Sequence, residues 1–142
     1  MKVSVTADSA GVKKALATLE KRVPLAAKQE VATSALNIRF GAMQRCPVDT
    51  GRLRASISIE YVRDGLGAEI GTEMQYAPYV EFGTKPHEIK PKTKRALFWP
   101  GAAHPVASVQ HPGTKAQPFL FPAWEEERPK LLTRIKERLA NG

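Results

Sequence analysis

The segment from Tyr76 to Thr84 constrains the fold more than any other part of the chain. Its residues, Tyr-Ala-Pro-Tyr-Val-Glu-Phe-Gly-Thr, alternate from Tyr79 onwards and end at a glycine turn, which predicts a strand followed by a turn. Because successive strand side chains point to opposite faces, Tyr79, Glu81 and Gly83 would share one face, and Phe82 would lie on the other. We expect the rest of the sheet to be arranged around this strand.

Glu81 adds a constraint of its own. A carboxylate beside aromatic residues is costly to bury without a partner, so Glu81 should either reach solvent or meet a cation. Arg52 and Arg54 lie upstream and are the candidate cations. We therefore expect the segment from Asp49 to Arg52 to pair with Glu81.

Helical periodicity predicts the other long elements. Apolar residues follow a helical repeat from about residue 12, Pro24 interrupts it, and the repeat returns over residues 25–45. We expect a kink at Pro24 or a new helix that begins there, with residues 25–45 as the main helix. A second amphipathic repeat follows Glu125, Glu126 and Glu127 and predicts a C-terminal helix.

Short alternating segments predict the strands. Residues 2–6 alternate, and residues 56–62 and 68–71 flank a glycine-containing turn that is typical of a hairpin. The Tyr79 strand would be the third in a meander, and residues 95–100 would add another. The expected fold class is α+β in a single domain of 142 residues, with an antiparallel sheet of roughly four to five strands and both long helices packed on it.

The connection between the main helix and the hairpin is rich in turn-forming residues. Short oxygen side chains bond to local amides, and glycine accepts a positive φ. The residues that we expect to build this corner and the sheet motif after it are Pro47, Asp49, Thr50, Gly51, Arg52, Leu53, Tyr79, Glu81, Phe82, Gly83 and Thr84.

Residues 85–117, here called the arm, differ in composition from the rest of the chain. They hold six cations and one acid, a net charge of +5 out of a total of +8. Five prolines argue against a long helix and for an extended structure with turns. The charge favours an acidic partner, such as nucleic acid or an acidic protein face. The cations are Lys85, Lys90, Lys92, Lys94, Arg95 and Lys115.

An apolar segment bracketed by prolines follows the arm. It runs from Pro118 to Trp124 and indicates a docking segment rather than a solvated loop. We therefore expect subunit contacts from the arm and from Pro118, Phe119, Leu120 and Trp124.

The histidines and the single cysteine offer little chemistry. His87, His104 and His111 lack a helical i, i+4 pair or another compact ligand spacing, so loop histidines are favoured over a metal site. Cys46 is the only cysteine, which excludes an intrachain disulfide, and no nearby histidine marks it as a nucleophile.

No other motif indicates catalysis. Gly83-Thr84-Lys85 and Gly113-Thr114-Lys115 lack the glycine spacing of a P-loop and are interpreted as glycine turns. Asp49 and Glu81 could form an acid–base pair, but no nucleophile accompanies them. We expect no cofactor, no bound metal and no enzyme activity.

The composition is that of a folded protein, with 42% apolar and 25% charged residues. No apolar run reaches the about 20 residues that a membrane-spanning helix needs, and the first residues lack a signal-peptide core. We expect synthesis in a cytoplasm and no membrane partner.

Three motifs, in this order and spacing, resemble a known family. They are Pro47 to Ile57, Tyr76 to Thr84 and Gln117 to Ala123. Together they resemble the small tail or neck components of long-tailed bacteriophages typified by gene product ten of phage HK ninety-seven. The resemblance implies a virion structural protein, made in the host cytoplasm, that joins head to tail or completes the tail as a subunit of a ring.

The resemblance also implies the partners. The ring would be a hexamer or dodecamer that meets connector, head-closure, tail-terminator or tail-tube proteins, and the arm would either line the DNA channel or reach over a neighbouring subunit. One alternative is a free DNA-binding protein whose arm contacts phosphates without reading bases. Another is a metal-dependent hydrolase that uses the histidines.

Overall fold

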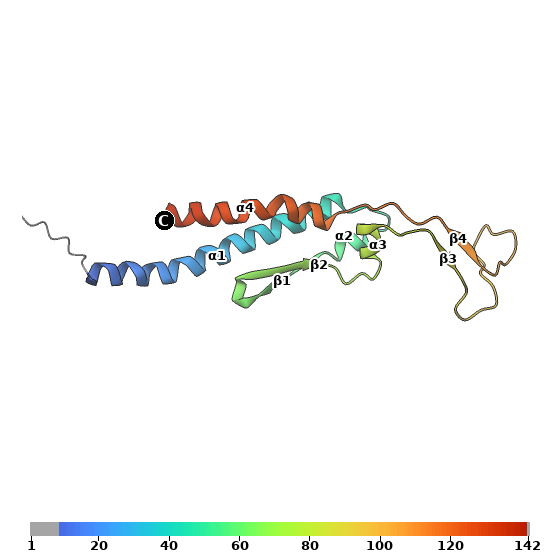
Figure 1. Cartoon of the computed structure of the whole chain (residues 1–142), viewed down its shortest axis with the longest axis horizontal. Helices are drawn as coiled ribbons and strands as arrows, with labels where there is room; N and C mark the ends of the chain where they lie inside the picture. Colours follow the sequence, from blue (N-terminus) through green and yellow to red (C-terminus); the bar gives the residue numbers. More distant parts are fainter. Residues whose placement is uncertain (1–8, 142) are drawn as a thin grey trace, which may run out of the picture.

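A computed structural model describes residues 9–141 of the chain. The strand expected at residues 2–6 lies outside this described part. The protein is elongated (Figure 1), with two long helices and a hairpin at one end and the arm projecting from the other. The order of elements is α1 (Ser9–Arg45), α2 (Arg52–Ala55), β1 (Ser58–Val62), η1 (Arg63–Gly65), β2 (Gly67–Gly71), α3 (Ala77–Phe82), β3 (His87–Ile89), β4 (Val109–His111) and α4 (Leu120–Ala140).

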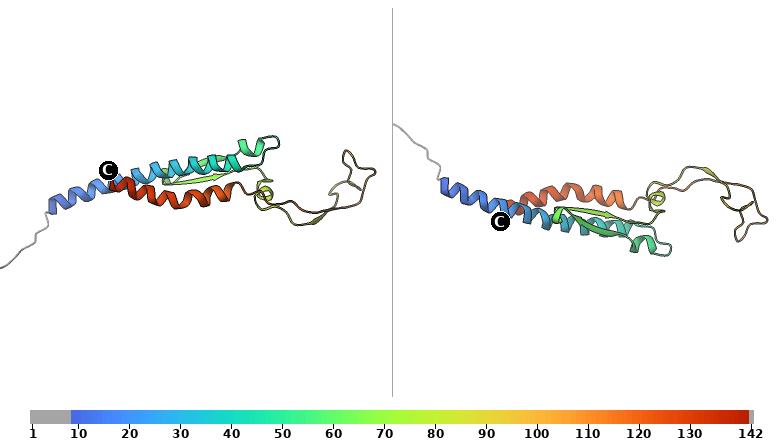
Figure 2. Two further views of the ribbon diagram at one scale, coloured as in Figure 1. Left: turned by 90° about the horizontal axis from the view of Figure 1, so that it is seen from above. Right: turned by 90° about the horizontal axis from the view of Figure 1, so that it is seen from below.

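The two long helices form the body of the protein. Helices α1 and α4 run antiparallel and lie side by side in all the ribbon views (Figure 2), while β1 and β2 pack against α1. Helix α1 continues through Pro24, so no second helix begins there. A proline within a helix removes one backbone N–H donor. Pro24 lies on an exposed stretch of α1.

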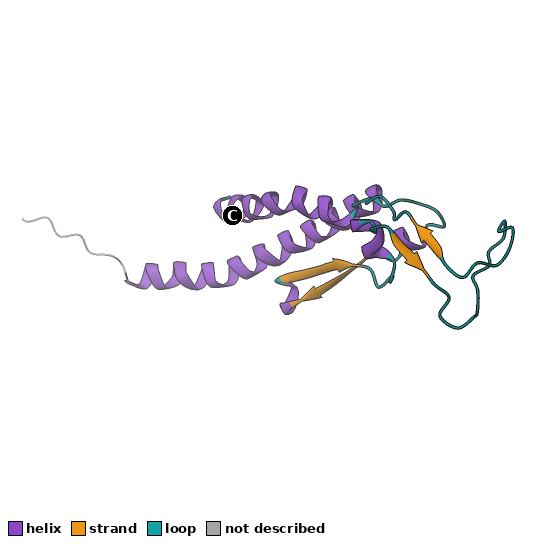
Figure 3. Cartoon of the chain, turned by 45° about the vertical axis from the view of Figure 1, so that its right-hand side comes forward, coloured by secondary structure: helices purple, strands orange, loops and turns teal. Residues whose placement is uncertain are grey.

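The sheet is smaller than the sequence predicted. The expected sheet of four to five strands was wrong, because the described residues form two separate two-stranded sheets, β1–β2 in the body and β3–β4 in the arm (Figure 3). The hairpin β1–β2 was predicted correctly and pairs antiparallel, with Ile59 opposite Ile70 and Glu60 opposite Glu69. Residues 95–100 form no strand, only an isolated bridge between Leu97 and Val106.

The predicted Tyr79 strand is a helix. In α3 the residues Ala77 and Glu81 are buried and Val80 is half-buried, which is the i, i+3, i+4 spacing of one helical face. Tyr79 and Phe82 point away from that face and are exposed. Pro78 stands in the first turn of α3, where a missing backbone N–H costs nothing.

The core lies where α1, α4 and the small elements meet. Its buried residues are Ile38, Ala42, Cys46, Leu53, Ile57, Ala77, Phe119 and Ala123. Phe119 and Ile57 are the largest side chains among them that are almost completely buried. The small alanines on α1 and α4 allow their backbones to approach closely, so one compact cluster joins all parts of the body.

Charged residues are also buried between α1 and α4. The Arg134 side chain donates hydrogen bonds to Glu30 Oε2 at 2.9 Å, to Ser34 Oγ at 2.6 Å and to Glu127. The Arg138 side chain donates to Glu30 Oε1 at 2.6 Å. The two helices are therefore joined by a polar network as well as by apolar contacts.

The network keeps its acids ionised. Burial alone would raise the pKa of Glu30, but hydrogen bonds and charge from Arg138 and Arg134 outweigh it and hold that pKa below its ordinary value. Burial likewise opposes ionisation of Glu127, and hydrogen bonds from Arg134 and Asn37 lower its pKa. The charged forms of both acids belong to the folded state.

The arm has no core of its own. Its two sides are joined by β3–β4, by a bridge between Thr84 and Thr114, and by the bridge between Leu97 and Val106. No residue from Gly83 to Pro118 is buried. The expected extended, helix-free arm is therefore present, and backbone pairing holds it in shape.

The elongated form leaves an unusually large surface. The chain exposes 11276 Å² for a mass of 15.6 kDa. A compact monomer of that mass exposes about 7,200 Å². The excess of about 4,000 Å² is larger than the area of about 800 Å² that one partner contributes to a standard interface.

Candidate assembly interface

The chain leaves the body for the arm, and returns to it, at the carboxylate of Glu81. Glu81 Oε2 accepts hydrogen bonds from the backbone N–H groups of Phe119 at 2.9 Å and Leu120 at 3.0 Å, and Glu81 Oε1 accepts one from Phe121 at 2.9 Å. These N–H groups belong to the first turn of α4, which has no other side-chain cap. An anion at a helix N-terminus is favourable, because the free N–H groups and the helix dipole both point at it.

This arrangement corrects the partner predicted for Glu81. Among residues 9–141 no ion pair joins Glu81 to Arg52 or Arg54; both of its oxygens accept hydrogen bonds from backbone donors instead. Glu81 is only 8% exposed, so its main partners are these backbone groups rather than solvent. Sequence reasoning considered only side-chain partners and therefore missed it.

The predicted corner is present: it connects α1 to the short helix α2, and strand β1 follows. Gly51 adopts a φ of 77°, and Leu53 on α2 enters the core. Asp49 and Thr50 are exposed beside it. The corner residues Pro47, Val48, Asp49, Thr50, Gly51, Arg52 and Leu53 line a groove together with Tyr76 and Val80.

The two Gly-Thr-Lys triplets meet at the base of the arm, and we call Gly83, Thr84, Gly113 and Thr114 the arm root. Thr84 N donates to Thr114 O at 3.0 Å, and Thr114 N donates to Thr84 O at 3.1 Å. The φ of Gly83 is 71°, and a Cβ there would lie 2.5 Å from Thr114 O. The φ of Gly113 is 84°, and a Cβ there would overlap Thr84 O. Glycine is required on both sides.

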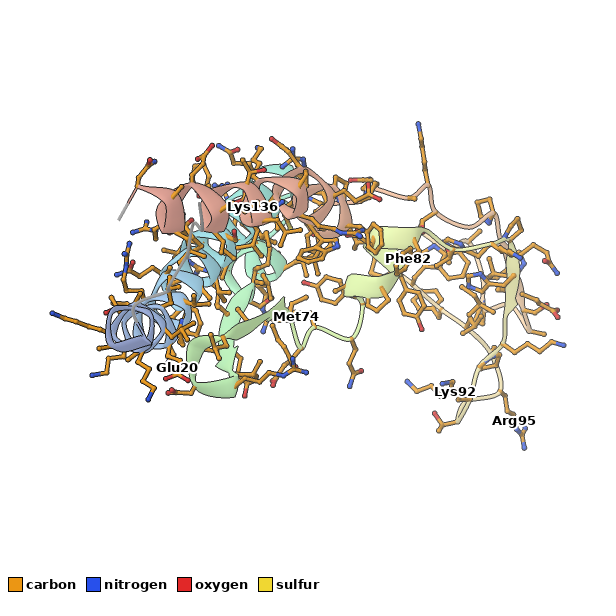
Figure 4. All side chains as sticks on the ribbon, turned by 60° about the vertical axis from the view of Figure 1, so that its left-hand side comes forward. Glu20, Met74, Phe82, Lys92, Arg95 and Lys136 are labelled. Carbon is orange, nitrogen blue, oxygen red and sulfur yellow. The ribbon has the colours of Figure 1, made fainter. Side chains whose placement is uncertain are left out.

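The predicted cations of the arm are exposed and mostly unpaired. Lys85, Lys90, Lys92, Lys94, Arg95 and Lys115 are all exposed. Within residues 9–141, Lys90 is the one member of this set with an ion pair, to Glu88 at 2.9 Å. Figure 4 shows Lys92 and Arg95 at the distal end of the arm, away from Met74 and Phe82 of the body.

The body carries an apolar groove beside the arm root. It has a volume of about 300 Å³ and lies between the β2–α3 connection and the start of α4. Two aromatic side chains on its walls are largely exposed, Phe82 at 72% and Phe121 at 55%. Its full lining is Gly71, Thr72, Met74, Gln75, Ala77, Pro78, Glu81, Phe82, Phe119, Leu120 and Phe121.

Comparison with known proteins identifies the family. Residues 10–83, just over half of the chain, match the family described as "Bacteriophage HK97-gp10, putative tail-component". The chain belongs to this family. Membership confirms the resemblance drawn from the sequence motifs and indicates a role as a phage tail component in the virion. No curated protein and no solved structure matches the chain.

The family match covers α1 to the first glycine of the arm root. In this tail-component chain the docking segment divides into two kinds of residue. Phe119 is buried in the core and cannot contact a partner, which corrects its predicted role. Pro118 and Trp124 are exposed and Leu120 is partly buried, so these three remain available for contacts.

Two of the three histidines are brought together. His87 and His111 are opposite each other in β3–β4 and stack with ring centroids 5.1 Å apart, whereas His104 is exposed in the connecting loop. In the described part of the chain no group of three or more His, Cys, Asp or Glu side chains could hold a metal ion. Burial raises the pKa of the Cys46 thiol, and the charge of Arg54 only partly offsets this.

No helix within residues 9–141 of this tail component combines the length and the apolar character required to cross a membrane.

Proposed function

We propose that this chain is a structural subunit of a ring at the neck or the head-proximal end of a phage tail. It would join head to tail or complete the tail by assembly, without catalysis. The observation that carries the proposal is the excess surface: a tail component that exposes about 4,000 Å² more than a compact monomer has room for several neighbours.

Unsatisfied features of the body support self-association. The hairpin β1–β2 is two-stranded, so each strand has an edge with unpaired backbone groups. The first half of α1 exposes Leu16, Leu19 and Val23 at helical spacing, at 56%, 46% and 42%. A closed ring can cover both features, because each copy offers its neighbour a different face.

The proposed ring would have different partners around its circumference, at its two ends and in its channel. Copies of the chain would contact each other around the ring, as a hexamer or dodecamer, and connector, head-closure, tail-terminator or tail-tube proteins would contact the ends. Genomic DNA would pass through the channel. The arm would reach over a neighbouring subunit or line that channel.

Electron microscopy of phage particles tests the proposal. Particles assembled without this chain should accumulate as separate heads and tails, or as tails with an unfinished head-proximal end. Particles assembled with it should show a symmetric collar of matching mass at that end. Normal joined particles in its absence would contradict the proposal.

A second candidate is non-specific DNA binding through the arm. Five exposed cations of the arm favour it, because they form no ion pair with any residue from 9 to 141. Binding of this kind rests on phosphate contacts and weakens steeply with salt, with a slope of about −0.9 per phosphate neutralised. Titration of the isolated chain with duplex DNA over a salt series tests it. Tight, strongly salt-dependent binding by the monomer would favour this candidate, and no binding would exclude it.

A further inference from the structure

The tip of the arm exposes two large aromatic residues. Phe98 is 68% exposed and Trp99 is 46% exposed, and they follow directly after Leu97, which pairs with Val106. Transfer of such apolar side chains from water into a partner's pocket is favourable. The tip therefore has the composition of a docking segment, but its two aromatic side chains are not buried.

The tip cannot use the groove of its own chain. The arm extends away from the body, and its distal end lies at the opposite end of the molecule from the hairpin β1–β2 (Figure 1). The groove beside Phe82 and Phe121 lies on the body side of the arm root. Contact between tip and groove therefore requires two copies of the chain.

The body also carries an unusual acidic pair near the groove. Glu60 and Glu69 are directly opposite each other in β1–β2, and both are exposed. Like charges at opposite positions destabilise a sheet. No cation of the described chain forms an ion pair with either of them. Glu73 is a third exposed acid, and it lies in the chain between Thr72 and Met74, which both line the groove.

The tip carries the opposite charge close to its aromatic residues. Lys94 and Arg95 precede Phe98 by four and three positions, at most about 14 Å along an extended chain. On the body, Glu69 precedes Gly71, which lines the groove, by two strand positions or about 7 Å. An aromatic anchor in the groove would thus bring these two cations to the acidic pair.

We propose that the arm tip of one copy docks on the body of the next. Phe98 and Trp99 enter the groove beside Phe82 and Phe121, and Lys94 and Arg95 pair with Glu60, Glu69 and Glu73. This inference rests on the proposed self-assembly and specifies its contact. The contact is heterologous, since tip and groove are different surfaces, so it propagates from copy to copy; a rotation between copies that closes turns this series into the proposed ring.

A charge exchange tests the electrostatic half of the contact. Lys94→Glu with Arg95→Glu should weaken self-association about tenfold or more, measured by sedimentation, and Glu60→Lys with Glu69→Lys should do the same. Combining all four substitutions in one chain should restore association. Arg128→Glu with Lys136→Glu makes the same change of charge at exposed positions on α4 and should have little effect. Loss without restoration, or an equal loss in the α4 control, would overturn the docking.

Crosslinking tests the apolar half. In a Cys46→Ala background, a chain with Phe98→Cys mixed with a chain with Phe82→Cys should form a disulfide-linked dimer that joins the two variants. The matched control replaces Phe82→Cys by Leu132→Cys, which is 64% exposed on α4. No linked dimer, or one that forms equally fast with Leu132→Cys, would overturn the docking.

The outcomes separate the two proposals. If the unmodified chain associates but the exchange and the crosslink both fail, the tip docks elsewhere and the ring proposal is unaffected. If the chain remains monomeric at every concentration and phage particles join normally without it, the ring proposal fails and the docking fails with it.

Discussion

The body and the arm of this protein are stabilised in different ways. In the body, α1 and α4 share an apolar cluster and a buried network in which Arg134 joins Glu30 and Glu127. In the arm, residues 85–117 include no buried side chain, and short backbone ladders hold the two sides together. The body therefore has a packed core, whereas the arm depends on backbone pairing alone.

The difference indicates that the body provides the stability of the fold, whereas the arm provides a surface for contacts between molecules. Short two-stranded ladders are marginally stable in water when nothing packs on them. Two features separate this marginally stable arm from the body: the backbone pairing of the arm root and the cap that Glu81 forms on α4. Variants of the body should therefore change stability, and variants of the arm should change assembly alone.

The largest effect is expected from Arg134→Met. Removing this guanidinium leaves Glu127 with no cation and Glu30 with only Arg138, both inside the helix pair, and breaking a buried ion pair in this way costs about 3–5 kcal/mol. Urea unfolding followed by circular dichroism measures the loss. Arg128→Met, at an exposed position on the same helix, should change the free energy of unfolding by less than about 0.5 kcal/mol. Equal effects of the two variants would contradict the assigned role of the network.

Glu81→Ala should come next. It leaves three N–H groups at the start of α4 without acceptors, one of them on the buried Phe119, at a cost of about 3 kcal/mol. The same unfolding measurement applies, and hydrogen exchange should accelerate first in α4. Glu88→Ala removes an exposed acid from the arm and should leave the stability of the body unchanged. A stable Glu81→Ala variant would show that the cap is dispensable.

Acid should weaken the body by a smaller amount. The pKa values of Glu30 and Glu127 are lowered in the folded state, so their contribution to stability is present above about pH 4.5 and is lost as the pH falls through the lowered values. The free energy of unfolding should fall as the pH is lowered from about 7 to about 3, with the loss concentrated below about pH 4.5. Glu30→Gln with Glu127→Gln should flatten this dependence. High salt should preserve it, since buried pairs are poorly screened.

Gly113→Ala should have the smallest effect on the body and a local effect on the arm. The added Cβ would overlap Thr84 O, so the two sides of the arm root must separate. Amide exchange in β3 and β4 should accelerate, while the free energy of unfolding of the body changes by less than about 0.5 kcal/mol. Gly101→Ala is the matched control, because its φ is also positive at 96° but its Cβ would meet no atom within 4 Å. Equal exchange in both variants would argue against a role for the root.

Much of this division could be predicted from the sequence. Periodic apolar residues predicted α1 and α4, the alternation around Asp64 predicted β1–β2, and charge with proline predicted the arm. These signals extend over many residues or include a turn of defined chemistry. The segment from Tyr76 to Thr84 was misassigned because α3 has only six residues, too few for a period of 2 to be told from one of 3.6.

The junction between body and arm could not be predicted in the same way. The carboxylate of Glu81 binds backbone N–H groups up to 40 positions away, and backbone donors leave no trace in the amino-acid pattern. The arm root did leave a signal. The repeated triplets at Gly83 and Gly113 mark two glycine backbones that face each other, but they were treated as separate turns.

The Glu81 cap has a consequence for how freely the arm can vary. By fixing the two ends of a segment 38 positions long at one carboxylate, it closes a loop whose interior no longer matters to the body. The entropy of closing such a loop changes slowly with its length, by only about 0.6 kcal/mol for each doubling. Insertions and deletions between the two attachment points are therefore thermodynamically inexpensive, so evolution could alter the reach of the subunit without redesigning its helices.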